Sequence, residues 1–287
     1  MGNYKLSNNH FLDQQASYDK AGVVILPVPF ERTVSYGGGT KNGPAAILQA
    51  SHFVETYDRE SNSEPYTICI HTAGAVLPEK KPEKMIAVIE KKVAELINAR
   101  KFPVILGGEH TLSIGTIYGA LKKYPDLSVL HFDAHTDMRS KYQGDPYSHA
   151  CVMYHVRLKT KNTVSVGIRS MGADEMPYIN KQKPKIFYAE DIAKKGMPIK
   201  QIIKDLKKDV FISFDVDAFD PAFLEQTGTP EPGGLGWYQT LDLLREVFKT
   251  RNVIGCDVVE LAPNSAHPNA DFTIASLIYK MIGFKFA

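Results

Sequence analysis

The stretch Ser128–Asp137 (SVLHFDAHTD) decides the fold class of this 287-residue chain. It starts as an apolar run typical of a buried β-strand and then changes to acidic and histidine side chains. Two other segments share this pattern: Val104–Leu106 precedes Gly107-Gly108-Glu109-His110, and Val210–Phe214 precedes Asp215-Val216-Asp217. Ligands of open parallel sheets bind beyond the carboxyl ends of the strands. The three segments therefore predict a parallel α/β sheet with a polar site at that edge.

Short β-branched runs alternate with longer segments of helical period along the whole chain. The expected strands are Val23–Val28, Tyr66–His71, Val104–Leu106, Ser128–Asp133, Thr163–Gly167, Lys185–Tyr188, Val210–Asp215 and Val253–Val259. The expected helices are Pro44–Phe53, Pro82–Arg100, Thr111–Lys123, Ala150–Leu158, Ala173–Asn180, Pro198–Lys207, Gly236–Lys249 and Asn269–Met281. Eight strands alternating with helices predict a three-layer α/β/α sandwich with a mostly parallel eight-stranded sheet.

The composition is that of an ordinary soluble globular protein, with 44% hydrophobic and 23% charged residues. The 34 Lys and Arg exceed the 32 Asp and Glu by two, and the two signs are interspersed along the chain. This balance favours neither nucleic acid nor a membrane surface as a partner. No linker, charge block or repeat interrupts the alternation of strands and helices, so residues 1–287 are expected to form a single domain.

Three features predict a cytoplasmic location. Cys69, Cys151 and Cys256 are scattered, with Cys69 and Cys256 in apolar runs that read as strands, which suits buried reduced thiols better than a disulfide framework. The apolar run Val23–Phe30 is too short to span a bilayer. The polar segment Met1–Asn8 lacks the apolar core of a signal peptide and does not fit a myristoylation motif.

The acidic segments carry the pattern expected of metal ligands. In an extended backbone alternate side chains share a face, so Asp133, His135 and Asp137 can converge, and Asp215 and Asp217 can do the same. A single Asp at a strand end usually forms a turn or caps a helix. Both patterns together, each directly after a buried strand, favour metal coordination, because bound cations would compensate for the burial of the carboxylates.

Together with His110, these residues offer four carboxylates and two imidazoles, and four negative charges balance two divalent cations. Oxygen-rich ligation favours Mn²⁺, while Fe²⁺, Co²⁺ and Zn²⁺ stay open. Two adjacent ions lower the pKa of a shared water and supply hydroxide at neutral pH, so the implied chemistry is hydrolysis. His131 lies about 6.6 Å back along the strand from Asp133, at roughly 3.3 Å per residue, and is expected to pack rather than to bind metal.

Three blocks, Gly107–His110, Phe132–Asp137 and Ser213–Pro221, resemble the signature motifs of the ureohydrolase family, which contains arginase, agmatinase and formiminoglutamase. The resemblance extends from Pro27 to Pro263 and implies an arginase-like fold that assembles as a homotrimer or homohexamer. It also implies two Mn²⁺ ions. One would be held by His110, Asp133, Asp137 and Asp215, and the other by Asp133, His135, Asp215 and Asp217.

Two further residues gain roles from this resemblance. Glu260 ends the predicted strand Val253–Val259; it could be a surface or capping residue, but the matching family position binds a guanidinium group bidentately. His149 could cap the following helix or pack, but it is similar to the family's mobile catalytic histidine, which protonates the leaving amine. We therefore expect Glu260 and His149 to bind substrate, and these two with Asp137 to be catalytic. A Cys151–His149 nucleophile pair is not expected, because positions i and i+2 of a helix do not face each other.

The substrate is expected to be a small cationic guanidino compound. Thr227–Gly234 and Tyr147–Cys151 resemble agmatinases, and Met138–Tyr147 lacks the polar pattern with which arginases bind the amino-acid end of arginine. Agmatine is thus the favoured substrate, giving urea and putrescine for polyamine biosynthesis. Ala150, where many agmatinases have Gly, leaves aminopropylagmatine or guanidinobutyrate open, and arginine is a further alternative. A non-catalytic oligomeric binding protein and a single-metal deacylase are the competing classes.

Two remaining features have weaker expectations attached to them. Gly37–Lys41 lacks the spacing of a phosphate loop and is interpreted as a turn that borders the substrate entrance. Arg169 and Asp174 follow a strand and could touch substrate, although a structural salt bridge is an equally good interpretation of either residue.

Overall fold

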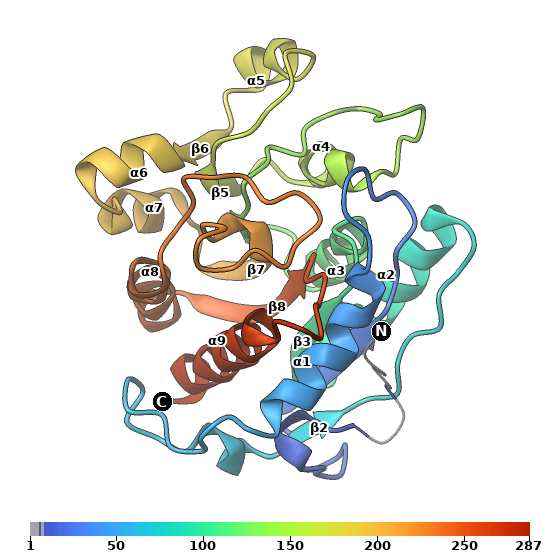
Figure 1. Cartoon of the computed structure of the whole chain (residues 1–287), viewed down its shortest axis with the longest axis vertical. Helices are drawn as coiled ribbons and strands as arrows, with labels where there is room; N and C mark the ends of the chain where they lie inside the picture. The colour runs from blue at the N-terminus through green and yellow to red at the C-terminus, as the bar shows by residue number, and fades with distance from the viewer. Residues whose placement is uncertain (1–5, 7–8) are drawn as a thin grey trace.

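The computed structural model describes residues 6 and 9–287, and its centre is one eight-stranded sheet in which every neighbouring pair is parallel (Figure 1). The strand order is β2-β1-β3-β8-β7-β4-β5-β6. The strands are β1 (Val23–Val28), β2 (Ile70–Thr72), β3 (Phe102–Gly107), β4 (Ser128–Phe132), β5 (Thr163–Ile168), β6 (Lys185–Tyr188), β7 (Asp209–Asp215) and β8 (Asn252–Val259). The predicted eight-stranded parallel sheet is confirmed.

Helices cover both faces of the sheet (Figure 1). They are α1 (Gly43–Ser51), α2 (Pro82–Asn98), α3 (Leu112–Leu121), α4 (Val152–Lys159), α5 (Met176–Gln182), α6 (Ala189–Lys195), α7 (Ile199–Asp205), α8 (Trp237–Thr250) and α9 (Asn269–Phe286). Buried side chains of α1, α6, α7, α8 and α9 belong to one hydrophobic cluster, and those of α2, α3, α4 and α5 to another. The three-layer sandwich predicted from the alternating pattern is therefore confirmed as well.

The four strands at the middle of the sheet position the site. In β3, β4 and β8 every residue but one is buried, and β7 is buried from its second residue onward, because apolar side chains pack against helices on both faces. The order β3-β8-β7-β4 brings the carboxyl ends of these strands side by side. The acidic and histidine segments that follow them are thus collected at one edge of the sheet.

Gly108 allows the chain after β3 to turn closely past its neighbour. A Cβ atom at this position would collide with the carbonyl of Phe30, which accepts a hydrogen bond from the backbone N–H of Glu109 at 2.8 Å. Only a residue without a side chain permits this approach. The turn leaves Glu109 and His110 buried beneath the segment that follows β1.

Several element boundaries differ from the sequence prediction. The strand expected at Tyr66–His71 is wrong over its first four residues, because Pro65 starts a short 3₁₀ turn, Pro65–Ile68, and Cys69 has a positive φ of 63°. Cys69 is therefore partly exposed and lies outside a strand, whereas Cys256 lies in β8 and is buried, as expected. All three cysteines are free.

One short helix escaped prediction. α6 has Glu190 and Asp191 in its first turn and Lys194 and Lys195 in its last, a charge pattern that complements the helix dipole. Its seven residues carry only Ala189 and Ile192 as buried side chains, too few to show a helical period. Short helices of this kind have little apolar signal of their own.

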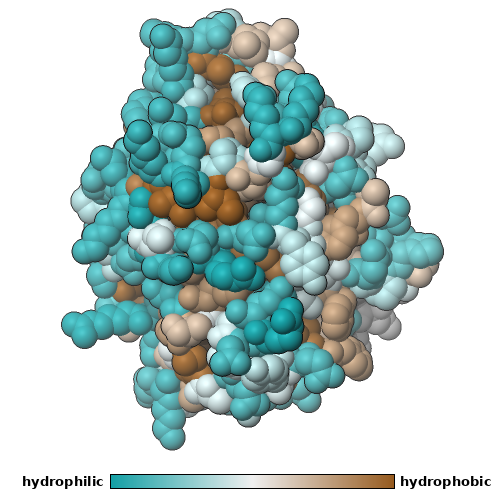
Figure 2. All heavy atoms as spheres, turned by 90° about the vertical axis from the view of Figure 1, so that its left-hand side faces the viewer, coloured by the Kyte–Doolittle hydropathy of each residue, from teal (hydrophilic) through white to brown (hydrophobic). Residues whose placement is uncertain are grey.

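The surface agrees with the mixed composition. On the face shown in Figure 2, polar and charged side chains are spread widely, with smaller apolar areas between them. Among the described residues, no helix is both long enough and apolar enough to cross a membrane. The expectation about the polar N-terminus concerns Met1–Asn8, and all of these residues except Leu6 lie outside the described part of the chain.

Candidate metal centre and active site

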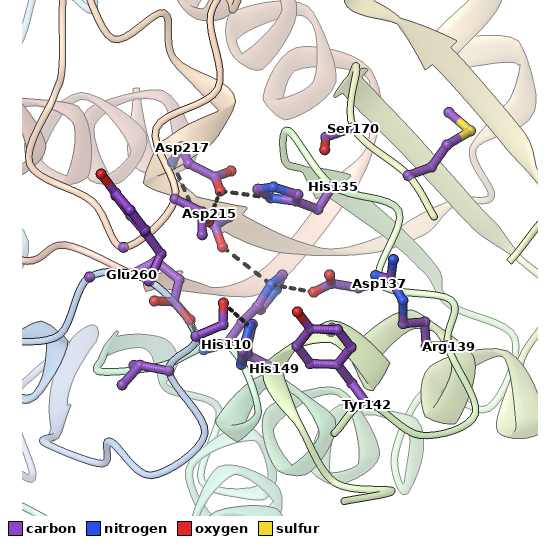
Figure 3. A pocket seen from close by; sticks show the side chains of 18 residues that line it. His110, His135, Asp137, Arg139, Tyr142, His149, Ser170, Asp215, Asp217 and Glu260 are labelled. Atoms are coloured by element: carbon purple, nitrogen blue, oxygen red, sulfur yellow. Dashed lines mark hydrogen bonds and ion pairs between the residues drawn. The ribbon is translucent and has the colours of Figure 1, made fainter. Parts of the chain in front are cut away.

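A cavity of about 230 Å³ lies at the carboxyl edge of the sheet (Figure 3). We call its inner part the floor, which consists of His110, Asp133, His135, Asp137, Asp215, Asp217 and Glu260. We call its outer part the rim, which consists of Val34–Gly37, Arg139, Tyr142, His149, Ser170, Met171, Gly228 and Thr229. Seven of the eight residues predicted from sequence to form the site thus line one cavity, and the eighth, Asp133, contacts two of them, His110 and His135.

His110 is the centre of the first ligand cluster on the floor. Its Nδ1 atom is buried and makes no hydrogen bond, yet it lies near three carboxylate oxygens. The distances are 3.2 Å to Asp133 Oδ2, 3.1 Å to Asp137 Oδ2 and 3.3 Å to Asp215 Oδ2. Figure 3 shows His110, Asp137 and Asp215 pointing toward one another. These are the four residues that the resemblance assigns to one metal ion.

The second cluster surrounds His135. Its Nδ1 atom lies 2.9 Å from Asp217 Oδ2 and 3.5 Å from Asp133 Oδ1. Asp133 therefore faces both histidines, which is the position expected of a carboxylate between two ions. Asp133, His135 and Asp217 offer ligand atoms close enough together to hold a metal.

Backbone N–H groups aim the carboxylates. Asp217 Oδ1 accepts a hydrogen bond from Ala134 at 2.9 Å, and Asp215 Oδ1 accepts one from Asp217 at 2.9 Å. The other oxygen of each carboxylate, Oδ2, is the one that faces a histidine. Each aspartate is thus held by one oxygen and presents the other to the cavity.

Two floor residues have unusual backbone conformations. Asp137 has a φ of 51° and Glu260 a φ of 66°, in the left-handed region that non-glycine residues rarely adopt. Such conformations are found where surrounding structure holds a side chain in a required direction. Around Glu260, its own N–H donates to Gly108 O at 2.8 Å, and its Oε1 accepts from the backbone N–H of His110 at 2.6 Å.

Negative charge dominates the floor. Burial raises the pKa of Asp215 well above its usual value, and the charges of Asp217 and Asp133 add to this effect. Burial and the charge of Asp133 also raise the pKa of Asp217. Burial, with the charge of Glu109, raises the pKa of Glu260 to about 8. In the absence of metal these carboxyl groups therefore hold protons more tightly than ordinary ones.

The negative charge of the floor also raises the pKa values of its two histidines, although burial lowers them. Burial alone would lower the pKa of His110, but Asp133 and Asp137 raise it well above its usual value. Burial acts in the same direction on His135, and Asp217 and Asp133 outweigh it, raising its pKa to about 12. Both rings sit where a cation is strongly favoured.

This arrangement fits a divalent metal centre. A buried imidazole nitrogen without a hydrogen bond faces three carboxylate oxygens, and carboxylates with imidazoles are ligands suited to Mn²⁺ and related ions. His131 packs, as expected: its ring stacks on His110, its Nε2 lies 2.8 Å from Asp133 Oδ2, and its Nδ1 lies 3.1 Å from Ser165 Oγ. His131 thus contacts Asp133 directly, and together with His110 and Asp133 it also offers ligand atoms close enough together to hold a metal.

The nitrogen of His110 that faces away from the cavity contacts polar groups that the sequence analysis missed. His110 Nε2 lies 3.3 Å from Ser213 Oγ, which donates to Asp257 Oδ1 at 2.8 Å, and Thr116 donates to the other oxygen of Asp257. Partners of this kind fix the ring orientation of metal-binding histidines. Ser213 and Asp257 lie inside apolar strands. A single polar residue in such a strand was the only sequence feature that could have pointed to them.

His135 has a different partner on its outer side. Its Nε2 lies 3.8 Å from Glu231 Oε1, an oxygen that accepts a hydrogen bond from Ser170 Oγ at 2.9 Å. Arg169 donates to the backbone carbonyl of Glu231 and to that of Asp217, at 2.6 and 2.7 Å. Arg169 therefore fixes the backbone around the site and does not line the cavity. Asp174 instead forms a surface ion pair with Arg139 at 3.2 Å.

Glu175 is another residue that sequence reasoning missed. It is buried, accepts hydrogen bonds from Met138 N at 2.8 Å and Gly172 N at 2.6 Å, and also binds Thr136 Oγ1. These bonds hold the turn that contains Asp137. Glu175 lies directly before α5, inside the helix expected at Ala173–Asn180, and a helical pattern does not indicate its contact with the turn of Asp137.

On the rim, His149 is the predicted proton donor. Its Nδ1 lies 3.1 Å from Thr33 Oγ1, and its Nε2 lies 3.5 Å from Ser35 Oγ. Cys151 is buried, and burial raises the pKa of its thiol to about 12, which agrees with the expectation that it is no nucleophile. Gly37 borders the cavity, as expected of the glycine-rich turn.

Comparisons with known proteins agree with this geometry. Residues 21–283 match the model of the arginase family. The chain is 36% identical to an N(1)-aminopropylagmatine ureohydrolase of Synechocystis, over 96% of this chain and 93% of the relative, and 32% identical to an agmatinase of Bacillus subtilis, over 97% of both chains. The crystal structure of an agmatine ureohydrolase of Thermoplasma volcanium superposes with a TM-score of 0.88 and 28% identity, over 99% of this chain and 95% of that one. This chain belongs to the arginase family, whose members include agmatinases and aminopropylagmatine ureohydrolases.

Proposed function

We propose that this protein is an agmatinase, which hydrolyses the guanidinium group of agmatine to urea and putrescine with two Mn²⁺ ions. The observation that supports this most strongly is the convergence of two histidines, four aspartates and Glu260 on one cavity. The competing deacylase class needs fewer acidic ligands and has no use for Glu260.

The floor would hold both ions. His110, Asp133, Asp137 and Asp215 would bind one, and Asp133, His135, Asp215 and Asp217 the other. When bound, the ions supply hydroxide at neutral pH. The protein contributes fixed ligands, because backbone N–H groups and buried partners hold the carboxylates and imidazoles in place.

Glu260 would bind the guanidinium group. Its carboxylate is buried at the end of β8, lines the cavity, and is tied to the backbone of His110 through Oε1. A planar cation can pair with a carboxylate through two hydrogen bonds. Because burial raises the pKa of Glu260 to about 8, a cationic partner also offsets the cost of ionising this group near neutral pH.

His149 would protonate the nitrogen that leaves. It stands on the rim and not on the floor, so it can face the scissile bond without competing for metal. Expulsion of an amine needs a general acid, and a positioned histidine contributes roughly 10² to 10⁴ in rate.

The rim bears on which guanidino compound is used. All of the carboxylates that line the cavity belong to the floor, so the distal end of a substrate meets hydroxyl groups, backbone and the rings of Tyr36 and Tyr142. Arg139 lines the rim, but Asp174 and Glu175 pair with it at 3.2 and 3.4 Å. A substrate carboxylate therefore finds no unpaired arginine among the lining residues, which disfavours guanidinobutyrate and arginine.

Aminopropylagmatine is the second candidate substrate. Two observations favour it. The chain is similar to aminopropylagmatine ureohydrolases, and no rim carboxylate among the lining residues fixes the position of the substrate's distal amino group, so a longer substrate can be accommodated. Tyr36 is 86% exposed at the mouth and could contact a second amino group through its ring.

The test is urea release from agmatine, aminopropylagmatine, guanidinobutyrate and arginine by purified protein with Mn²⁺, together with metal analysis. We expect two ions per chain and a kcat/KM for agmatine well above that for either guanidino acid. A higher value for aminopropylagmatine would favour the second candidate. Saturable binding without urea release would indicate a non-catalytic binding protein, and one ion per chain would contradict the binuclear centre.

We further propose that the protein acts in the cytoplasm, in polyamine biosynthesis, as a homotrimer or homohexamer. Light scattering of the metal-loaded protein tests the assembly. A monomer at micromolar concentration would contradict it.

A further inference from the structure

We propose that Glu109 and Thr33 position His149 for proton transfer through a chain of hydrogen bonds that runs from carboxylate to hydroxyl to imidazole. This inference rests on the proposed function, in which His149 protonates the leaving amine. Glu109 belongs to the Gly107–His110 block, yet neither metal binding nor guanidinium binding uses it.

Glu109 is fully buried and bound to the segment after β1. Its Oε2 accepts hydrogen bonds from the backbone N–H groups of Arg32 and of Thr33, the latter at 2.6 Å, and its Oε1 accepts one from Thr33 Oγ1 at 2.9 Å. In the described part of the chain no lysine or arginine forms an ion pair with it. Both of its oxygens thus serve one purpose, which is to hold residues 32 and 33.

Thr33, held by Glu109, in turn contacts His149. Its Oγ1 lies 3.1 Å from His149 Nδ1 and accepts a hydrogen bond from the backbone N–H of His149 at 3.0 Å. A hydroxyl has one proton to donate and two lone pairs to accept with. Because the Thr33 proton goes to Glu109, the Thr33 oxygen faces His149 as an acceptor. Ser148 Oγ also lies near Nδ1, at 3.4 Å, but Thr33 Oγ1 is nearer, at 3.1 Å, so in this proposal Nδ1 carries a proton.

The consequence concerns the other ring nitrogen. In the neutral ring, a proton on Nδ1 leaves Nε2 unprotonated. His149 lines the cavity, and Nε2 has only the 3.5 Å contact with Ser35 Oγ on the rim. Nε2 is therefore the atom that takes up a proton and gives it to the leaving nitrogen, while the Nδ1–H bond to Thr33 persists in both states.

The ring is also confined from the side. Tyr142 meets it edge to face, with 5.9 Å between ring centroids. Packing of this kind limits rotation but does not select one tautomer. Selection depends on the hydroxyl of Thr33, which makes Thr33 a positioning residue whose effect can be separated from packing.

Thr33→Val and Thr33→Ser form a matched pair for the test. Valine keeps the shape of threonine and its backbone N–H but removes the hydroxyl, whereas serine keeps the hydroxyl. We expect Thr33→Val to lower kcat about tenfold, less than the loss expected on removing a general acid, because the imidazole remains. KM and the number of metal ions per chain should stay unchanged, and Thr33→Ser should restore most of the activity.

A second measurement does not depend on activity. In protein with ¹⁵N-labelled histidine, loaded with diamagnetic Mg²⁺ or Zn²⁺, ¹H–¹⁵N spectra report which nitrogen of each neutral ring is protonated; His149→Asn assigns the signal. We expect the Nδ1–H form in the wild type and in Thr33→Ser, and a mixture of tautomers in Thr33→Val.

The outcomes separate the two proposals. Wild-type protein that releases no urea from any guanidino compound contradicts the proposed function, whatever the tautomer. An Nε2–H tautomer in the wild type, or equal kcat values for Thr33→Val and wild type in an active enzyme, overturns the role of Glu109 and Thr33. Equal losses in the valine and serine variants also overturn it, because the hydroxyl would then be irrelevant.

Discussion

The floor and the rim of the cavity are built on different principles. Floor residues follow the buried strands β3, β4, β7 and β8, and Asp133, Asp215 and Asp217 are at most 3% exposed. Rim residues lie in loops, apart from His149, which begins the short 3₁₀ turn His149–Cys151, and Tyr36 among them is 86% exposed. The floor is positioned by the sheet itself, while the rim depends on a few hydrogen bonds such as those of Glu109. The proposed metal ligands and the proposed proton donor His149 thereby lie on separable parts of the structure.

The two histidines of the floor also differ in burial and in the residues that support them. His110 is buried, and Ser213, Asp257 and Thr116 lie behind it in the core. The side chain of His135 is 24% exposed, and its outer nitrogen faces Glu231, which itself is held by Ser170. The proposed metal site next to His135 would therefore be supported from the rim, and the proposed site next to His110 from the core.

Loss of a floor carboxylate should have the largest effect. Asp133 faces both histidines, so we expect Asp133→Asn to disrupt both metal sites and to lower urea release by more than about 10⁴-fold, since the metals supply the nucleophile. Metal analysis should show fewer than two ions per chain. Asp191→Asn on α6, far from the cavity, is the control. Two retained ions in Asp133→Asn would contradict the assignment of Asp133.

Loss of the rim histidine should have a smaller effect of a different kind. His149→Asn should lower kcat by roughly 10² to 10⁴ and leave two metal ions bound, because His149 belongs to the rim. Steady-state kinetics with metal analysis checks both parts. His155→Asn, a histidine of α4 outside the lining, should retain activity. Metal loss in His149→Asn would remove the distinction between floor and rim.

The charge on the floor predicts how pH affects the metal-free protein. The pKa values of Asp215, Asp217 and Glu260 are raised, that of Glu260 to about 8, so these groups bind protons more tightly when folded. Stability from a raised pKa is present at low pH and is lost as pH rises through the folded value. We expect the free energy of unfolding of chelator-treated protein to fall by roughly 1 kcal/mol per pH unit between pH 6 and 8.

Denaturant unfolding at several pH values measures this slope. Glu260→Gln should reduce it, and Mn²⁺ should reverse it, because ionised carboxylates bind the metal. A rise in the free energy of unfolding of the metal-free protein between pH 6 and 8 would contradict the raised pKa values of the floor carboxyl groups.

The smallest effect should come from the outer support of His135. We expect Glu231→Gln to lower the affinity for one of the two ions about tenfold, at the weak end of the range for outer partners of metal ligands, because 3.8 Å is a loose contact. Metal competition with a chelator measures the change. Glu246→Gln on α8 is a matched control, since the two side chains are 39% and 40% exposed. Equal loss of affinity at both sites would contradict the proposed support.

Much of the floor could be predicted from the sequence, for a physical reason. Asp133, His135 and Asp137 lie two residues apart directly after a buried strand, and this spacing marked them in the sequence. The expected extended backbone was wrong, because β4 ends at Phe132, Asp137 has a φ of 51° and Asp217 lies in the 3₁₀ turn Val216–Ala218. The rule that parallel strands present their carboxyl ends at one edge then joins them to His110, Asp215 and Glu260. The strand signals were strong because both faces of each central strand are apolar.

The supports of the site could not be predicted in the same way. Thr33 is 76 residues from Glu109 and 116 from His149, and as a threonine in an irregular segment it carries no periodic signal. Ser213 and Asp257 were visible as polar residues inside apolar strands, but their pairing depends on the neighbouring positions of β7 and β8. The start of β2 was misjudged because a 3₁₀ turn precedes it, and α6 was missed because its two buried side chains show no helical period.

The sequence by itself determined the parallel α/β architecture, the edge of the sheet where chemistry occurs and the set of acidic and histidine residues there, because all three follow from short-range periodicity and from the burial of charge. Only the tertiary structure decided which nitrogen of each histidine faces the cavity, which carboxylate oxygen is free and what holds His149. Those choices depend on contacts between segments far apart in the chain, and no local pattern encodes the angle at which such segments meet.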